Sequence, residues 1–259
     1  MSGQSTAGPG DSLEALLAQG QTLLTAGDPA AATEPLLTAV LLHPDSADAH
    51  GWMGRALRAL GQWEDALGCL QEALRLRPDD PGLELQQGRV LVDLGRFEAA
   101  AACFTRAVEA DPGLLAAWAN LGAALHILGD LDGSARASTR ALELDPEHAN
   151  ARCNLGLVQL LRGDYRKGLA NVDHRFQRAG GLELLKAQPP CERWQGAELP
   201  TGQPLLLVAE QGLGDTVQFM RYLPRLRRQG LEVELCAQEP LHGLIRQSGL
   251  DPAPLSPEQ

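Results

Sequence analysis

The segment whose residue types are best suited to catalysis or ligand binding is EQGLGD at residues 210–215, which ends in the carboxylate of Asp215. Gly212 and Gly214 precede it, between a short apolar run and a stretch with helical spacing. Glycines let a backbone approach a ligand closely, and the N–H groups at the start of a helix attract anions. The segment is therefore a candidate anion-binding loop, with Asp215 as a candidate general base. The same residues also suit a tight strand-to-helix turn in which Asp215 caps the helix.

Motifs for nucleotides and metals do not occur in the sequence. Val217 stands where the dinucleotide fingerprint G-x-G-x-x-G needs its third glycine, and no G-K-[ST] follows the loop. The five cysteines form no C-x-x-C or C-x-x-H pattern, and His126 has no second ligand at helical spacing. We therefore expect neither a metal site nor a cofactor.

The elements that position the candidate residues repeat along the chain every 34 residues. Glycine recurs in this register at two places in each unit: Gly20, Gly54, Gly88, Gly122 and Gly156, and Gly27, Gly61, Gly95, Gly129 and Gly163. A period near 34 with helical patterning indicates stacked helix pairs. The predicted repeats, which follow a flexible start at residues 1–10, are 11–44, 45–78, 79–112, 113–146 and 147–180.

The second repeat illustrates the two helices of each unit. Residues 47–60 have apolar side chains at the i, i+3, i+4, i+7 spacing of a helix, and residues 63–75 form the second helical pattern. Gly61 is expected to end the first helix because glycine tolerates the left-handed conformation. Pro78 is expected to stop the second helix.

Small side chains indicate where the two helices of a repeat meet. Gly54 and Ala66 are expected to lie at a close crossing, because a larger side chain there would force the helices apart. The larger Leu57, Trp63 and Leu70 are expected to fill the space between repeats.

Composition narrows the class of protein. Hydrophobic residues make up 44% of the chain, so a large core is expected and general disorder is not. The formal net charge is −11, which disfavours binding to nucleic acid. The main effect expected of this charge is solubility, and the alternative is a preference for basic partners. No apolar run reaches the length of a membrane span and the N-terminus does not resemble a signal peptide. We expect a cytoplasmic protein.

At this point the pattern resembles the tetratricopeptide repeat family over about two-thirds of the chain. The resemblance is carried by Met53-Gly54, Leu121-Gly122 and Leu155-Gly156, by Gly61-Gln62-Trp63, Gly95-Arg96-Phe97 and Gly163-Asp164-Tyr165, and by Pro78, Pro112 and Pro146. It implies that the first helix of each repeat lines a concave face that binds peptides or proteins. The candidate binding residues on that face are Arg55, Arg89, Asn120, His126, Asn154 and Leu157.

Two asparagines occupy the same place in successive repeats, Asn120 and Asn154. The chain is similar here to the repeats of protein O-GlcNAc transferases, in which asparagines at that place hydrogen-bond the backbone of a guest. An amide suits this role because it both donates and accepts. The alternative is that both are ordinary solvated residues of a helix.

A different pattern begins after a linker at residues 181–202. It predicts a strand, a helix, a second strand and a second helix, at residues 204–209, 215–228, 231–237 and 240–248. This order is typical of the start of a doubly wound sheet. Residues 203–259 are therefore predicted to form a partial α/β unit of Rossmann-like type.

The run RWQGAELP followed by PLLLVAEQGLGDTVQFMRYLPRL resembles the bacterial glycosyltransferases that are linked to such repeats and are similar to heptosyltransferases. The resemblance implies that Asp215 is the general base, with Gly212 and Gly214 shaping the loop. Relative to that family, the sequence ends within the first Rossmann-like half and does not include the donor-binding half. Whether the chain is an enzyme therefore stays open.

The predicted fold is mostly α, a right-handed α–α superhelix followed by the partial α/β unit. The leading functional hypothesis is a scaffold that binds a protein or peptide on the concave face. The alternative is a nucleotide-sugar-dependent glycosyltransferase completed by further chain or by a second protein. A third hypothesis is a structural scaffold that self-associates through the open edges of the C-terminal sheet.

Overall fold

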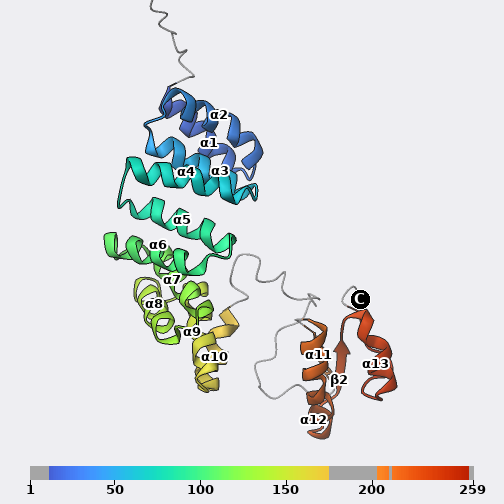
Figure 1. Cartoon of the computed structure of the whole chain (residues 1–259). Helices are drawn as coiled ribbons and strands as arrows, with labels where there is room; N and C mark the ends of the chain where they lie inside the picture. The colour runs from blue at the N-terminus through green and yellow to red at the C-terminus, as the bar shows by residue number, and fades with distance from the viewer. Residues whose placement is uncertain (1–11, 175–202, 210–211, 257–259) are drawn as a thin grey trace, which may run out of the picture. The chain divides into compact units, whose positions relative to one another are not determined.

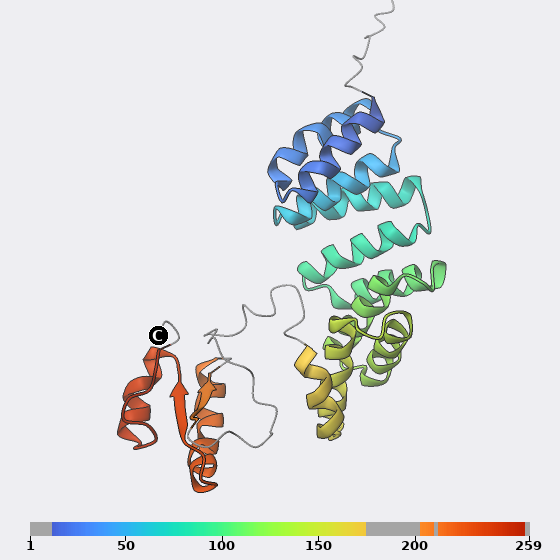
Figure 2. The ribbon, with the colours of Figure 1, turned by 180° about the vertical axis from the view of Figure 1, so that it is seen from behind.

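The computed structural model describes residues 12–174, 203–209 and 212–256. The chain divides into two compact units, Met1–His174 and Arg175–Gln259, and each is described by itself. The first is entirely helical where it is described, and the second combines short helices with a small sheet (Figures 1 and 2).

The first unit is a stack of five helix hairpins, which Figure 1 shows from blue to yellow. The hairpins are α1 (Leu13–Thr25) with α2 (Pro29–Leu42), α3 (Ala47–Ala59) with α4 (Trp63–Leu76), α5 (Pro81–Asp93) with α6 (Phe97–Ala110), α7 (Leu115–Ile127) with α8 (Leu131–Leu144), and α9 (Ala149–Leu161) with α10 (Tyr165–Val172). The predicted solenoid of helix pairs is therefore confirmed.

Local sequence explains where the helices begin and end. The side chains of Ser12, Asp28, Ser46 and Asp80 each accept a hydrogen bond from the backbone N–H three residues later, which satisfies a free donor at a helix start. Gly61 has φ +75°, and the equivalent glycines of the other four hairpins share this left-handed conformation. The first helix of each hairpin ends there, as expected.

Each hairpin closes around a glycine that faces the second helix, and in the second and third hairpins the side chain opposite the glycine is large. A Cβ added to Gly88 would lie 2.4 Å from Cε1 of Phe104, and one added to Gly54 would lie 2.8 Å from Cγ of Leu70. Phe104 and Leu70 are fully buried. The glycine therefore provides the space that the second helix fills, and Ala66 lies at the same crossing with its carbonyl oxygen 3.2 Å from the added Cβ of Gly54.

The spacing between hairpins makes the stack curved. The odd-numbered helices α1, α3, α5, α7 and α9 contact each other in succession, whereas the even-numbered helices make at most marginal contact with one another in the described residues. Helices that lie closer together are on the inside of a bend. The first helix of each hairpin thus lines the concave side.

One expectation about the repeats needs correction. Trp63 does not fill the space between repeats, because it is the first residue of α4 and its surface is 42% exposed. Pro35 lies buried inside α2. Residues 175–180 of the fifth predicted repeat lie outside the described residues.

A buried ion pair connects the two helices of the third hairpin. Arg106 on α6 donates two hydrogen bonds to the carboxylate of Glu84 on α5, at 2.7 and 2.8 Å. Only 7% of the Glu84 side chain is exposed, and the hydrogen bond raises the pKa of Arg106. Burial, and to a smaller extent the nearby charge of Glu84, raises the pKa of Cys103 to about 11. Cys69 and Cys103 are both free thiols.

The second unit contains a parallel two-stranded sheet. Its elements are β1 (Leu205–Val208), α11 (Leu213–Phe219), the 3-10 helix η3 (Met220–Tyr222), α12 (Leu223–Arg228), β2 (Val233–Cys236), the 3-10 helix η4 (Glu239–Leu241) and α13 (His242–Gln247). Leu205 pairs with Val233 and Val208 with Cys236. A small core that includes Leu223, Leu235 and Ile245 holds these elements together. Two strands do not by themselves define a Rossmann-like unit.

The predicted helix at residues 215–228 differs in the structure. It begins two residues earlier, at Leu213, with Gly212 and not Asp215 as the N-cap residue. A 3-10 turn divides it, and Pro224 lies at the start of α12, where its missing N–H is tolerated. Arg227, near the end of α12, donates a hydrogen bond to the carbonyl oxygen of Val233 at 2.9 Å.

None of the helices in the described residues is long and apolar enough to cross a membrane.

We expect the substitution Gly88→Ala to lower the free energy of unfolding by about 1–3 kcal/mol, because the new methyl group would overlap the ring of Phe104. Gly68→Ala is the matched control. A Cβ there meets nothing within 4 Å, so it should raise helix stability by about 0.5–1 kcal/mol. Urea denaturation followed by circular dichroism measures both. Equal effects would contradict the close crossing.

Candidate functional site

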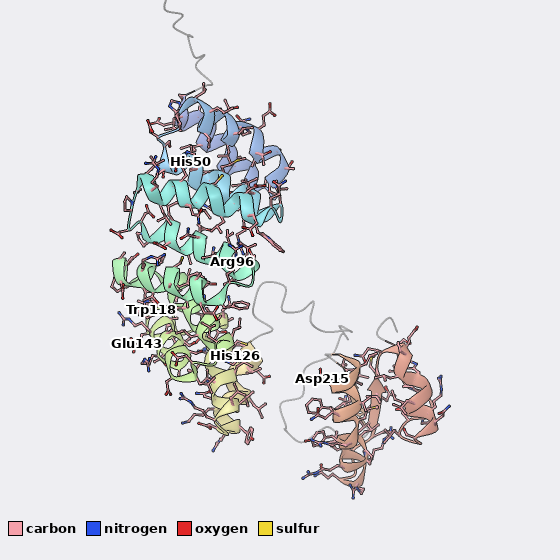
Figure 3. All side chains as sticks on the ribbon, viewed as in Figure 1. His50, Arg96, Trp118, His126, Glu143 and Asp215 are labelled. Carbon is pink, nitrogen blue, oxygen red and sulfur yellow. The ribbon has the colours of Figure 1, made fainter. Side chains whose placement is uncertain are left out.

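The predicted binding residues all lie on first helices of their hairpins. Arg55 lies on α3 and Arg89 on α5, and these helices contact each other. The remaining four lie on α7 and α9: Asn120, His126, Asn154 and Leu157. Figure 3 labels His126, which lies on α7. Each of these residues belongs to the first helix of its hairpin, the row of helices on the inside of the bend.

Three arginines gather where α3 meets α5, and we call Arg55, Arg58 and Arg89 the arginine cluster. Arg58 pairs with Asp93, with 2.5 Å between Nε and Oδ2 and a second bond of 3.3 Å to Oδ1. The guanidinium of Arg55 lies 4.0 Å from the centre of the Trp52 ring, a cation–π contact. The cluster thus contains three positive charges and one carboxylate.

The pKa values of the cluster reflect this imbalance. Burial lowers the pKa of Arg89, the charges of Arg58 and Arg55 lower it further, and Asp93 acts in the opposite direction. Burial also lowers the pKa of Arg55. Arginine starts so far above neutrality that both remain charged. Within the described residues, neither has an ion pair, so their positive charges are available to a ligand.

The asparagines differ in what they contact. The amide of Asn120 donates to the carbonyl oxygen of Ala116 in its own helix, at 2.6 Å. Asn154 is 8% exposed and donates to the carbonyl oxygen of Ala119, at 3.0 Å, which connects α9 to α7. Asn154 is therefore not a solvated helix residue. One N–H of each amide is already occupied.

The row of first helices becomes more apolar toward α9. Ala123 on α7 and Leu157 on α9 occupy the repeat position of Arg55 and Arg89, and both are half-buried. His126 is also half-buried, and its Nδ1 is a buried atom with no hydrogen-bond partner among the residues that the structure describes. One end of the inner row is thus basic and the other is mainly apolar.

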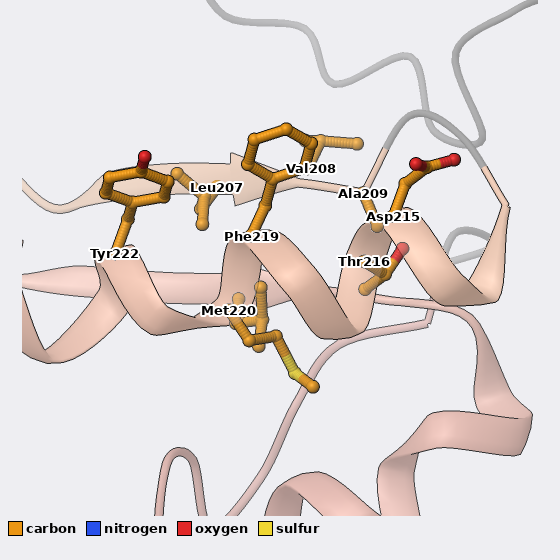
Figure 4. A pocket seen from close by; sticks show the side chains of 9 residues that line it. Leu207, Val208, Ala209, Asp215, Thr216, Phe219, Met220 and Tyr222 are labelled. Atoms are coloured by element: carbon orange, nitrogen blue, oxygen red, sulfur yellow. The ribbon is translucent and has the colours of Figure 1, made fainter.

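Asp215 lies in a separate place, in the first turn of α11 in the second unit. It lines a hollow of about 370 Å³ together with Val208 of β1, Phe219 of α11 and Tyr222 of η3 (Figure 4). The rings of Phe219 and Tyr222 are stacked with their centres 6.1 Å apart. A carboxylate beside aromatic rings can bind a polar ligand that also has an apolar face.

The two loop glycines are not required by backbone conformation or packing. Neither Gly212 nor Gly214 is among the glycines with positive φ. A Cβ on Gly214 would meet nothing within 4 Å, and one on Gly212 would approach only the Asp215 carboxylate, at 3.7 Å. Of the alternative of a strand-to-helix turn capped by Asp215, the cap is wrong, because Gly212 is the N-cap residue of α11. Thr216 stabilises this region by donating to Oε1 of Gln238 at 3.0 Å.

No group of three or more His, Cys, Asp or Glu side chains within the described ranges could hold a metal ion.

The geometry so far defines a class, the repeat proteins built from stacked helix hairpins with a concave inner row of helices. The model of the tetratricopeptide repeat family matches residues 17–81, 85–138 and 128–170, which is more than half of the chain. The protein belongs to the tetratricopeptide repeat family. No curated protein matches the chain.

Solved structures with the same fold cover the helical part of the chain. MamA from Desulfovibrio magneticus RS-1 is 23% identical, with a TM-score of 0.57, and the match covers 64% of this chain and 93% of that one. YrrB, described as a tetratricopeptide repeat protein with an unusual peptide-binding site, is 23% identical, with a TM-score of 0.54 and coverage of 65% and 87%. PilF from Pseudomonas aeruginosa is 19% identical, with a TM-score of 0.59 and coverage of 65% and 77%. Identities this low show the fold alone.

The sequence analysis does not identify the two residues that contact the arginine cluster, Trp52 and Asp93. Asp93 is 35 residues after Arg58, one more than the repeat length, so it is a neighbour across the hairpin boundary. Trp52 precedes Arg55 by three residues on the same helix, a spacing that brings two side chains together. Both spacings are present in the sequence.

We expect Asn154→Ala to lower the free energy of unfolding by about 1–2 kcal/mol, because it removes a buried hydrogen bond between two repeats. Asn120→Ala is the control, since its amide bonds only to its own helix and its loss should change stability little. Urea denaturation measures the difference. If Asn154→Ala does not change the free energy of unfolding, the hydrogen bond of this amide does not stabilise the contact between the two repeats.

Proposed function

We propose that the helical unit is a scaffold that binds an extended segment of a partner protein along α3, α5, α7 and α9. The observation that supports this proposal most is the closer contact among odd-numbered helices, because it places one helix of every hairpin on a shared concave surface. Family membership supports it as well, since tetratricopeptide repeat proteins bind peptides and proteins. The peptide-binding site in the description of YrrB is a property of that protein and is consistent with this proposal.

The proposed binding residues are Arg55, Arg89, Asn120, His126, Asn154 and Leu157. They would recognise side chains and backbone of the guest through charges at one end and apolar contact at the other. Asn154 would contribute through the part of its amide that does not bond to Ala119. We further propose that the five repeats keep the boundaries expected from the sequence, with residues 181–202 as a linker to the second unit.

Two matched substitutions of alanine by glutamate test the proposed scaffold. Peptides that bind the whole chain are first selected from a random library. Ala123→Glu, which adds a charge and a longer side chain at a half-buried position of the inner row, should weaken their binding about tenfold or more. Ala102→Glu, at an exposed site on the second helix of its hairpin, should leave binding unchanged. Equal binding by both variants, with both folded by circular dichroism, would place the partner elsewhere.

A second candidate function is glycosyl transfer with Asp215 as general base. The observation that favours it is the hollow that Asp215 lines together with Phe219 and Tyr222, a surface suited to the polar edge and apolar face of a sugar. Gly212 and Gly214 would let an acceptor approach the loop. Donor binding would need further sheet strands, supplied by additional chain or by a second protein that joins the open edge of β1 or β2.

An assay with several nucleotide sugars tests this second candidate. If the chain turns over a donor, we expect Asp215→Asn to reduce turnover about 100-fold or more, because the proton acceptor is lost. The control is Glu234→Gln, which makes the same chemical change at an exposed position of β2. Full activity of Asp215→Asn, measured with the completing strands present, would contradict the enzymatic hypothesis.

A further inference from the structure

One side of α2 carries apolar side chains that the fold does not use. Ala30, Glu34, Leu37 and Leu41 follow the i, i+4, i+7, i+11 spacing of a single helix side, and all four are exposed, Leu41 by 71%. We call these four residues the α2 stripe. Among the described residues, α2 makes more than marginal contact only with α1 and α3. The stripe therefore remains uncovered.

The other second helices are polar at the equivalent positions. In the following repeats the places of Leu37 and Leu41 are taken by Gln71 and Arg75 in α4, by Thr105 and Glu109 in α6 and by Thr139 and Glu143 in α8. The repeat therefore does not need leucine at either position. A terminal repeat usually has a polar outer face, and apolar side chains that gather on one exposed side indicate an interaction surface.

The charge around the stripe is negative. Residues 12–54 contain no lysine or arginine but several carboxylates, namely Glu14, Asp28, Glu34, Asp45 and Asp48. Within the described ranges, only Asp48 among them forms an ion pair, with Arg77. Glu34, in the middle of the stripe, therefore carries a charge that nothing in the first hairpin neutralises.

We infer that the α2 stripe docks a basic amphipathic helix of a partner protein, whose apolar side chains cover Leu37 and Leu41 and whose lysine or arginine faces Glu34. The negative charge of the first hairpin complements a basic partner, and the two leucines require an apolar face on it. The stripe lies on a second helix, so it is separate from the inner row of first helices. Docking here is therefore independent of the proposed function.

The shape of the stripe favours a helix as the partner. The backbone N–H and C=O groups of α2 bond within the helix, so an extended segment finds no open edge to pair with. A second helix can pack its side chains between those of α2, with the two axes about 8–10 Å apart. The stripe is about 17 Å long from Ala30 to Leu41, which matches about three turns of a partner helix.

Charge disfavours two other occupants. A second copy of the chain would place one acidic first hairpin against another. An anionic membrane attracts lysine and arginine, which residues 12–54 lack. For a basic helix, the apolar contact and the charge act in the same direction.

Fluorescence anisotropy with the whole chain tests the docking surface. The probe is a labelled peptide of about 14 residues with leucines along one side of a helix and lysines elsewhere, and its control has glutamate in place of lysine. The control should bind about tenfold more weakly or less. Leu37→Gln combined with Leu41→Gln should weaken the lysine probe about tenfold or more, because the apolar contact is lost. Ile127→Gln combined with Leu144→Gln, which changes exposed aliphatic side chains elsewhere, should not.

The charge and the helical form of the partner have tests of their own. Glu34→Gln should weaken the lysine probe about threefold, because it removes the carboxylate beside the leucines. Glu98→Gln makes the same change at an exposed position of α6 and should alter binding little. A lysine probe with a proline in its middle should not bind, since proline interrupts a helix.

Several outcomes would overturn the basic-helix site. These are no binding of the lysine probe, full binding of the proline probe, or full binding by the double variant of Leu37 and Leu41 when circular dichroism shows that it is folded. A loss with Leu157→Gln as large as with the double variant would place the probe in the inner row. If the double variant does not fold, Leu41→Gln alone replaces it.

Two further measurements identify a different occupant. If sedimentation shows a dimer that the double variant abolishes, the stripe joins two copies of the chain and the basic helix is wrong. If vesicles containing phosphatidylserine bind the unchanged protein but not the double variant, the occupant is a membrane. Peptides selected for the inner row should bind the double variant as they bind the unchanged protein, which separates this site from the proposed function.

Discussion

The close approach of two helices at a glycine is the constraint on which the helical unit depends. Gly54 faces Leu70 and Gly88 faces Phe104, and in each case the large side chain occupies the space that a Cβ would need. Because the contact recurs once in every 34 residues, each hairpin closes with similar geometry and presents a similar surface to the next one. A regular stack follows from this one repeated contact.

The regular stack converts sequence positions into rows of side chains. Odd-numbered helices lie closer to each other than even-numbered ones, so one position of every repeat lies on the inside of the bend. Along that row the residues change from Arg55 and Arg89 to Ala123 and Leu157. Interactions across the hairpin boundaries, such as Arg58 with Asp93 and Asn154 with Ala119, hold neighbouring inner helices together. The same surface therefore combines structural contacts with groups that remain open to a partner.

The second unit is organised by other means. Its parallel strands are joined through α11 and α12, and a small apolar core covers one face. Asp215 lies at the edge of a hollow where the end of β1 meets the first turn of α11, which is where parallel α/β units commonly bind ligands. The candidate residues of the second unit thus gather around one loop, whereas those of the helical unit follow a row of helices.

The sequence by itself determined the repeat length, the helix pairs, the glycines that end the first helices and the order of elements in the second unit. These features are local or repeated, so spacing along the chain is enough to predict them. Only the tertiary structure decided that Asn154 is buried, that Trp63 is exposed, that Asp93 pairs with Arg58 and that Gly212 rather than Asp215 caps α11. Such features depend on how side chains pack between elements that are distant in sequence or on the exact residue where a helix starts, and spacing alone does not specify either.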